Sequence, residues 1–146
     1  DDLTEVMISE MPLTNLYLPK KLEKIVVVDD IEHYPYRIGK TLKVKHGSIK
    51  NTAYIFENSA YISDCNDLSI VNKSVLKGLK FLVIDCLKFI KHPTHFNLDE
   101  SIYVHNKLNP KATILTNLHH DIDYDYLFKK LPKNIIPAYD GMKLGL

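Results

Sequence analysis

The sequence predicts an α/β fold, in which helices cover the strands of a sheet. Short apolar runs typical of strands recur along the chain, and after Asp64 they alternate with segments of helical periodicity. The run "LKFLVID" is continuously apolar, as expected of a strand that is buried on both faces of a sheet. With 146 residues, of which 45% are hydrophobic and 25% charged, the chain has the size and composition of one globular domain.

The first half of the chain is predicted to contain mainly strands. The early run "KIVVVDD" is β-branched and apolar, and in "YRIGKTLKVKH" the residues Leu42, Val44 and His46 alternate onto one face. Two further runs, "TAYIF" and "AYISD", flank a short polar turn at residues 57–59. We therefore expect a β-hairpin that ends at Asp64.

Helical segments appear between the later strands. Residues 67–77 are predicted to form a helix that ends at Gly78, because apolar residues recur there at near-helical spacing. These apolar residues are Leu68, Val71, Val75 and Leu79. After the strand "LKFLVID", Asn97 is predicted to cap a second helix, with Glu100 three residues later completing a capping box.

The final third of the chain predicts a strand, a short helix and a terminal β segment. "KATILTN" is strand-like, and residues 124–130 are predicted to form a helix that stops before Pro132. In "IIPAYDGMKLGL", the dipeptide Asp140-Gly141 predicts the turn of a β-hairpin.

Charge and cysteine content restrict the function. Nineteen basic and eighteen acidic residues give a net charge of +1, so no overall field favours nucleic acid or an anionic membrane. Cys65 and Cys86 lack metal-ligand spacing and are interpreted as reduced thiols. No apolar run approaches the roughly 20 residues of a membrane span. We therefore expect a cytoplasmic location and no membrane partner.

Polar side chains follow four of the predicted strands. They are His46, Asp64, His92 with His95, and Asn117 with His119 and His120. In α/β sheets, ligands bind at the carboxyl ends of the strands. Imidazole and carboxylate groups together are the ligands used by zinc or manganese. Jointly these residues favour a metal site.

Simpler explanations exist for each of these residues alone. Asp64 and Asp85 could cap the segments that follow them, and His46 could be an exposed loop residue. His92 precedes a proline and could only shape a turn.

Other histidines are weaker candidates. Neighbouring residues of an extended chain point to opposite sides, so at most one of His119 and His120 faces a site. His33 and His105 are interpreted as structural or exposed.

Taken in order, "KHG", "AYISD", "FLVIDCL", "HPTHFNLDES", "ATILTNLHHDIDYDYL" and "PAYDGMKL" resemble the second half of metallo-β-lactamase-fold hydrolases. The resemblance is to the cyclic phosphodiesterase group that includes phosphoribosyl 1,2-cyclic phosphate phosphodiesterase, with ribonuclease Z more distant. It runs from about Lys40 to Leu146. It implies the second half of a four-layer αββα sandwich and a site for two divalent ions, zinc or manganese.

The resemblance also implies roles for individual residues. His46 matches a ligand of one metal, and Asp64 matches the aspartate that bridges both metals. Two such metals lower the pKa of a bridging water, which makes hydroxide the nucleophile at neutral pH. His95 would then be the general acid that protonates the leaving oxygen, and His92 would orient a ligand or a phosphate oxygen.

The chain departs from the family at the last metal ligand. Many relatives have a histidine where this sequence has Asn117. His119 lies on the same face of an extended segment and is our preferred replacement ligand, with Asn117 or His120 as alternatives.

A second departure is larger, because the HxHxDH block that supplies most of the family's metal ligands is absent. We therefore expect residues 1–146 to be the C-terminal portion of a single metallo-β-lactamase-like domain, consistent with a first residue that is not methionine. Such a portion would expose an apolar face and an unpaired strand edge. We expect it to be inactive alone, and to dimerise, aggregate or bind a complementary N-terminal half.

The sequence thus predicts a metal-dependent hydrolase of a small phosphodiester. The alternative is a non-catalytic remnant or interaction module that keeps the fold. Nucleic acid is the less favoured substrate because of the balanced charge.

Overall fold

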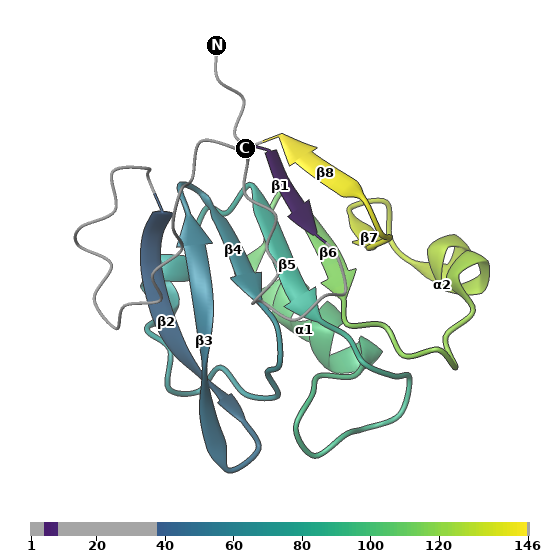
Figure 1. The fold of residues 1–146 in the computed structure, drawn as a ribbon, viewed down its shortest axis with the longest axis horizontal. Coiled ribbons are helices and arrows are strands. Elements are labelled where there is room, and N and C mark those ends of the chain that lie inside the picture. The colour runs from purple at the N-terminus through teal and green to yellow at the C-terminus, as the bar shows by residue number, and fades with distance from the viewer. Residues whose placement is uncertain (1–4, 9–37, 146) are drawn as a thin grey trace.

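A six-stranded sheet forms the main body of the protein (Figure 1). The structure is a computed structural model that describes residues 5–8 and 38–145, so the predicted early strand at 24–30 and His33 lie outside the described residues. The six strands are β2 (Ile38–His46), β3 (Ile49–Phe56), β4 (Ser59–Ile62), β5 (Phe81–Asp85), β6 (Ala112–Thr116) and β7 (Ile135–Pro137). They lie in the sheet in chain order.

The direction of the strands changes within this sheet. β2, β3 and β4 pair antiparallel, and the predicted hairpin between β3 and β4 is confirmed. β4, β5, β6 and β7 pair parallel, which requires the crossover connections expected of an α/β fold. The predicted α/β class is therefore confirmed.

Two α-helices accompany the sheet within residues 38–145, and both were predicted. α1 (Leu98–Leu108) begins with the expected capping box, because the Asn97 side chain accepts from the Glu100 backbone N–H and the Glu100 carboxylate accepts from the Asn97 N–H. α2 (Tyr124–Lys130) begins at the cap residue Asp123. Figure 1 shows α1 behind the sheet and α2 beyond its β7 edge.

The predicted helix over 67–77 is wrong. The structure has only a short 3₁₀ helix, η2 (Lys73–Leu76), in this segment. The Asp67 carboxylate accepts hydrogen bonds from the backbone N–H and hydroxyl of Ser69, and the Asn72 side chain does the same for Ser74. Such local side-chain bonds favour turns over a helix. The spacing of the apolar residues indicates which side chains are buried, not a helix, since Leu68, Val71 and Leu79 are buried.

The predicted terminal hairpin is also wrong. The chain does turn at Gly141, where φ is +84°, and the Met142 N–H donates to the Tyr139 carbonyl. However, β7 pairs with β6, whereas β8 (Met142–Gly145) pairs antiparallel with β1 (Glu5–Ile8) in a separate two-stranded sheet. The Asp-Gly signal predicts a turn but does not determine which strand each arm will join.

The core has two parts, one on each face of the main sheet. Along β5, Leu82 and Ile84 belong to the larger cluster, which includes Val104 of α1. Val83 belongs to the smaller cluster with Met142 of β8. Burial on both faces explains the continuous apolar run of β5. Within the described ranges, no helix has the length and apolar character needed to cross a membrane.

Candidate functional site

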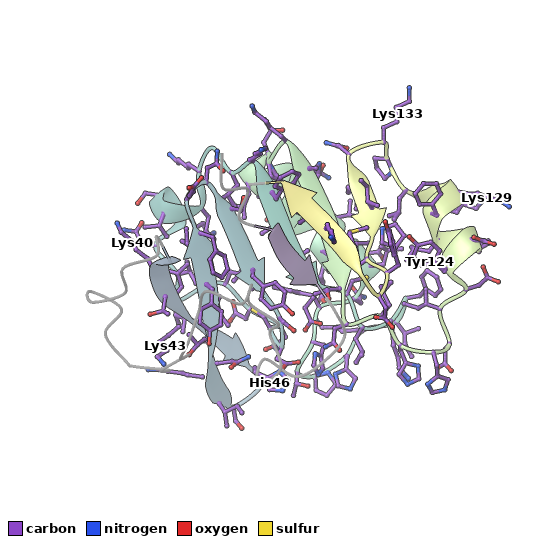
Figure 2. The ribbon with its side chains drawn as sticks, turned by 45° about the horizontal axis from the view of Figure 1, so that its top comes forward. Lys40, Lys43, His46, Tyr124, Lys129 and Lys133 are labelled. Atoms are coloured by element: carbon purple, nitrogen blue, oxygen red, sulfur yellow. The ribbon has the colours of Figure 1, made fainter. Side chains whose placement is uncertain are left out.

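The candidate site lies at the carboxyl ends of the parallel strands. β4, β5 and β6 point to the same edge of the sheet (Figure 1), and they are followed or ended by Asp64, Asp85 and Asn117. Asp64 and Asn117 have φ values of +48° and +62°, a left-handed backbone that aspartate and asparagine tolerate better than most residues. His46, the last residue of β2, reaches the same edge (Figure 2).

Asp85 is the buried centre of the site. Its side chain is fully buried, and one carboxylate oxygen, Oδ2, accepts from the Cys65 backbone N–H at 3.0 Å and lies 2.7 Å from His95 Nδ1. The other oxygen, Oδ1, accepts from the Asn117 side-chain amide at 2.9 Å. Burial raises the pKa of Asp85, and these hydrogen bonds act against the rise because they stabilise the charged form. Asp85 therefore joins three segments of the chain instead of capping a helix.

His95 is oriented by Asp85. The short contact at Nδ1 makes this nitrogen the donor to the carboxylate, so Nε2 is the ring nitrogen that keeps a lone pair. Asp64 Oδ1 lies 3.8 Å from the same Nδ1 atom. The His95 ring is 15% exposed and makes an edge contact with His46, with ring centroids 4.7 Å apart. The His95 ring is therefore held by Asp85 on one side and by the edge of His46 on another.

Asn117 lies among the acids and His95. Its amide nitrogen is 3.3 Å from Asp64 Oδ1, 2.9 Å from Asp85 Oδ1 and 3.2 Å from His95 Nδ1. The ligand atoms of Asp64, Asp85 and His95 all lie within 4.8 Å of one another. The amide N–H group is thus a hydrogen-bond donor in the place where a cation would contact the two carboxylates.

These residues fit a divalent metal ion. The carboxylate oxygens of Asp64 and Asp85 suit a divalent cation such as zinc or manganese, whereas the His95 Nδ1 atom beside them already donates to Asp85. His46 adds a further imidazole nearby. Its Nδ1 bonds to the Thr94 carbonyl at 2.8 Å, so its Nε2 carries the lone pair that a metal ligand needs.

A second set of contacts fixes the loop that carries His95. The Asn66 side chain accepts from the Gly47 N–H at 2.8 Å and donates to the Pro93 carbonyl at 3.1 Å. Gly47 has a φ of +61°, and a Cβ atom there would lie 2.7 Å from Thr94 Cγ2. The turn after β2 is therefore fastened closely to the loop, which sets the distance between His46 and His95.

The structure also places His92 beside the site. Its ring centroid lies 5.1 Å from that of His95, and its Nδ1 accepts from the Thr94 N–H at 3.4 Å. Partial burial, together with the nearby charge of His95, lowers the pKa of His92. Its predicted role of orienting a ligand stays a prediction.

His119 and His120 form a separate group with Asp121. His119 Nδ1 lies 3.0 Å from one Asp121 oxygen, and His120 Nε2 lies 3.1 Å from the other. The His120 side chain is 83% exposed. The structure therefore brings Asn117, and not His119 or His120, into contact with Asp64. The ligand role preferred for His119 stays a prediction.

Sequence reasoning did not assign Asp85 and Asn66 to the site. The available signal for Asp85 was an acid that directly ends a fully apolar strand, which is an unfavourable place for a carboxylate unless it has partners. Asn66 carried no comparable signal, because its partners, Gly47 and Pro93, are 19 and 27 residues away in the chain.

Comparison with solved structures supports the fold. The chain is similar to a diphosphatase of the PhnP family, with a TM-score of 0.70 and 34% identity over 73% of this chain and 42% of that chain. It is also similar to the metallo-β-lactamase-fold protein YhfI from Bacillus subtilis (TM-score 0.57, 18% identity, 71% of this chain and 47% of that chain). Human tRNase Z, short form, has a TM-score of 0.53 and 11% identity over 72% of this chain and 41% of that chain. The chain thus spans less than half of each of these proteins.

Comparison with known sequences adds little about activity. No family model matches the chain. An octanoyltransferase of Porphyromonas gingivalis is 26% identical over 104 residues, which are 70% of this chain and 21% of that enzyme. Because four fifths of that enzyme lie outside the match, its activity carries no argument for this chain. The sheet, the strand-end site and the structural likenesses together confirm that the chain has the fold of part of a metallo-β-lactamase-type domain.

Proposed function

We propose that this chain supplies part of the active site of a metal-dependent hydrolase that cleaves phosphate esters or diphosphates. The observation that carries the proposal is the contact of Asp64, Asp85, His95 and Asn117 at the carboxyl ends of three parallel strands. The relative with 34% identity is a diphosphatase, which supports phosphate as the group acted upon. Within this class we favour a small phosphodiester as substrate.

The proposed cofactors are two divalent ions, zinc or manganese, with His46 and Asp64 among their ligands. When bound, such ions polarise phosphoryl oxygens and lower the pKa of water, which is the chemistry that phosphoester hydrolysis needs. At the strand ends, the described residues offer the carboxylates of Asp64 and Asp85 with His46 nearby, and this suits one ion better than two. A second group of possible ligands, His119, His120 and Asp121, is more exposed and lies apart from these residues. We therefore propose that the remaining ligands come from a complementary N-terminal half or from a second copy, in the cytoplasm, with residues 1–146 as the C-terminal portion of the domain.

His95 is the proposed general acid. Its Nδ1 is held by Asp85, so a proton carried on Nε2 can pass to the oxygen that leaves phosphorus. The Asp85 carboxylate fixes the orientation and the tautomer of the ring. Burial of Asp85 keeps water from competing for this hydrogen bond.

The first experiment measures metal content and hydrolysis together. The purified chain is incubated with Mn²⁺ or Zn²⁺, desalted and assayed for bound metal, and it is then combined with a complementary N-terminal half and assayed for hydrolysis of bis(p-nitrophenyl) phosphate. We expect about one ion per chain, because the cluster offers one group of ligands. Asp64→Ala should lose the ion, whereas Asp125→Ala, which removes an exposed carboxylate from α2, should keep it.

The role of His95 is tested in the same assay. In the enzyme reconstituted with an N-terminal half, His95→Ala should lower turnover by about 10²-fold or more, while metal content stays close to that of the unchanged chain. Retention of full turnover by this variant would overturn the general-acid role. A chain that retains no metal, and that gives no hydrolysis of the diester when it is combined with an N-terminal half, would contradict the proposed function.

A second candidate function is a non-catalytic interaction module. It is favoured by Asn117, an amide at the position where many relatives carry a metal-binding histidine. Asn117→His distinguishes the two functions. A variant that binds metal more tightly and hydrolyses the diester faster supports a weakened hydrolase, and a variant with no gain in either supports the module.

A further inference from the structure

Two exposed aromatic rings from separate elements meet beside the site. Phe89, in the loop after β5, is 40% exposed, and Tyr126, on α2, is 54% exposed. Their ring centroids lie 6.3 Å apart and their planes are nearly perpendicular, at 87°. We call Phe89 and Tyr126 the aromatic corner. Large apolar groups that stay accessible together are typical of a binding surface.

The aromatic corner is connected to the site through the backbone of Leu87. The Leu87 N–H donates to the Phe96 carbonyl at 2.9 Å, and the Leu87 carbonyl accepts from the His119 N–H at 3.0 Å. Phe96 directly follows His95. Since Phe89 is two residues from Leu87, its backbone lies at most about 7 Å further along the chain. The Phe89 carbonyl also accepts from the side-chain amide of Asn97, two residues after His95, at 3.4 Å, so the loop that carries Phe89 lies against the segment that follows His95.

The charges around the aromatic corner are largely paired. Lys88 lies 3.4 Å from Asp121, and the Asp123 carboxylate accepts from the Tyr126 backbone N–H at 2.7 Å. Lys130 Nζ lies over the Tyr126 ring, 5.6 Å from its centroid. With a net charge of +1 for the whole chain, this surface suits a neutral, flat group better than a polyanion.

We propose that the aromatic corner stacks the base of a nucleotide substrate whose phosphate lies at the Asp64–His95 cluster. This inference rests on the proposed function and deepens it, because it names nucleoside phosphoesters as the substrate class. Bases stack on aromatic side chains whatever their identity, since every base has a π face. Two perpendicular rings offer a base one stacked contact and one edge contact, both of which are favourable aromatic geometries.

The test compares two ligands that differ only by a base. Binding of adenosine 5′-monophosphate and of ribose 5-phosphate to the full chain is measured by calorimetry in the presence of Mn²⁺. We expect the nucleotide to bind about tenfold more tightly, and the Phe89→Ala/Tyr126→Ala variant to bind both ligands equally. Tyr126→Phe keeps a ring and should retain the preference.

The chain offers a matched control for the loss of an exposed ring. Tyr103 on α1 is 61% exposed and lies under Lys107, with the Nζ atom 5.5 Å from the ring centroid, much as Tyr126 lies beside Lys130. Tyr103→Ala should therefore leave nucleotide binding unchanged. Circular dichroism confirms that each variant is folded.

Several outcomes would overturn the proposal. They are equal binding of the two ligands, a base preference that survives the double variant, and a change of sedimentation showing that the aromatic corner pairs two copies of the chain. Tighter binding of an RNA oligonucleotide, unaffected by the variants, would assign the surface to a different ligand. A base preference in a chain that retains no metal would keep a nucleotide site and reject the hydrolase, whereas metal retention without a base preference would do the reverse.

Discussion

At the scale of single residues, Gly47 determines how closely two parts of the site approach. It follows His46, adopts a left-handed backbone, and leaves no room for a Cβ atom beside Thr94. Its N–H is held by Asn66, which also holds the loop before His95. A residue without a side chain thus allows the close packing of the two histidine-bearing segments.

Gly47→Ala is expected to destabilise the protein more than Gly78→Ala. Both glycines have left-handed backbones, with φ of +61° and +69°, but a Cβ atom at Gly78 meets nothing within 4 Å. The strain common to both costs about 1 kcal/mol, and the contact with Thr94 should raise the loss at Gly47 to about 2–3 kcal/mol. Urea unfolding measures the difference. Equal losses would show that Thr94 moves aside without cost.

Single residues of the site differ in how well the sequence predicts them. The sequence allowed His46, Asp64 and His95 to be predicted, because polar residues at the ends of strands meet at one edge of a parallel sheet. It did not allow the role of Asp85 to be predicted, because its partners lie far away in the chain. They are Cys65, His95 and Asn117, at separations of 20, 10 and 32 residues. A buried acid depends on its partners, and these are assembled only by the fold.

At the scale of elements, a buried histidine joins α1 to the sheet. His105 of α1 is 5% exposed, its Nδ1 lies 2.7 Å from the Thr113 hydroxyl of β6, and its Nε2 accepts from the Asn134 side chain at 3.0 Å. Asn134 directly precedes β7. This neutral ring thus ties one helix to two strands, in keeping with the structural role predicted for it.

Stability should decrease in mildly acidic solution because of His105. Burial lowers the pKa of His105 from its ordinary value, so the unfolded ring gains a proton at a pH where the folded ring stays neutral. Its contribution is complete above about pH 6.5 and is lost as the pH falls toward the folded pKa, with a slope of at most about 1.4 kcal/mol per pH unit.

Urea unfolding of the unchanged chain and of His105→Gln from about pH 7.5 to 5 measures this loss. The variant should show a shallower decrease, since glutamine does not titrate. Parallel curves for the two proteins would contradict the prediction.

The elements that the sequence predicts well carry their signals locally. The capping box of α1 and the turn between β3 and β4 lie within a few residues, and both predictions are confirmed. The pairing of β8 with β1 depends on residues at opposite ends of the described chain, and no local pattern contains it. The same limit applies to 67–77, where side-chain bonds of Asp67 and Asn72 prevail over the apolar spacing.

At the scale of the whole molecule, two thiols lie inside the larger core. Cys65 and Cys86 are free, fully buried, and located at the ends of β4 and β5. Burial raises the pKa of each thiol to about 12. The reactive thiolate is therefore scarce as well as inaccessible in the folded protein.

Thiol modification should therefore report unfolding of the core. In the folded protein we expect neither cysteine to react with a thiol reagent at about pH 8, and both to react together as urea unfolds the chain. Cys65→Ser, which leaves Cys86 alone, should halve the number of modified thiols and keep the same dependence on urea. Immediate reaction of either thiol without urea would show that the core opens locally.

The strand order of the main sheet has a consequence for synthesis on the ribosome. Since β2 to β7 lie side by side in the order of the sequence, each strand that emerges can add to the edge left by the strand before it. No earlier pair has to separate to admit a later strand. The main sheet is then complete when β7 emerges, and the last contact to form is the pairing of β8 with β1 in the second sheet, which needs both ends of the described chain.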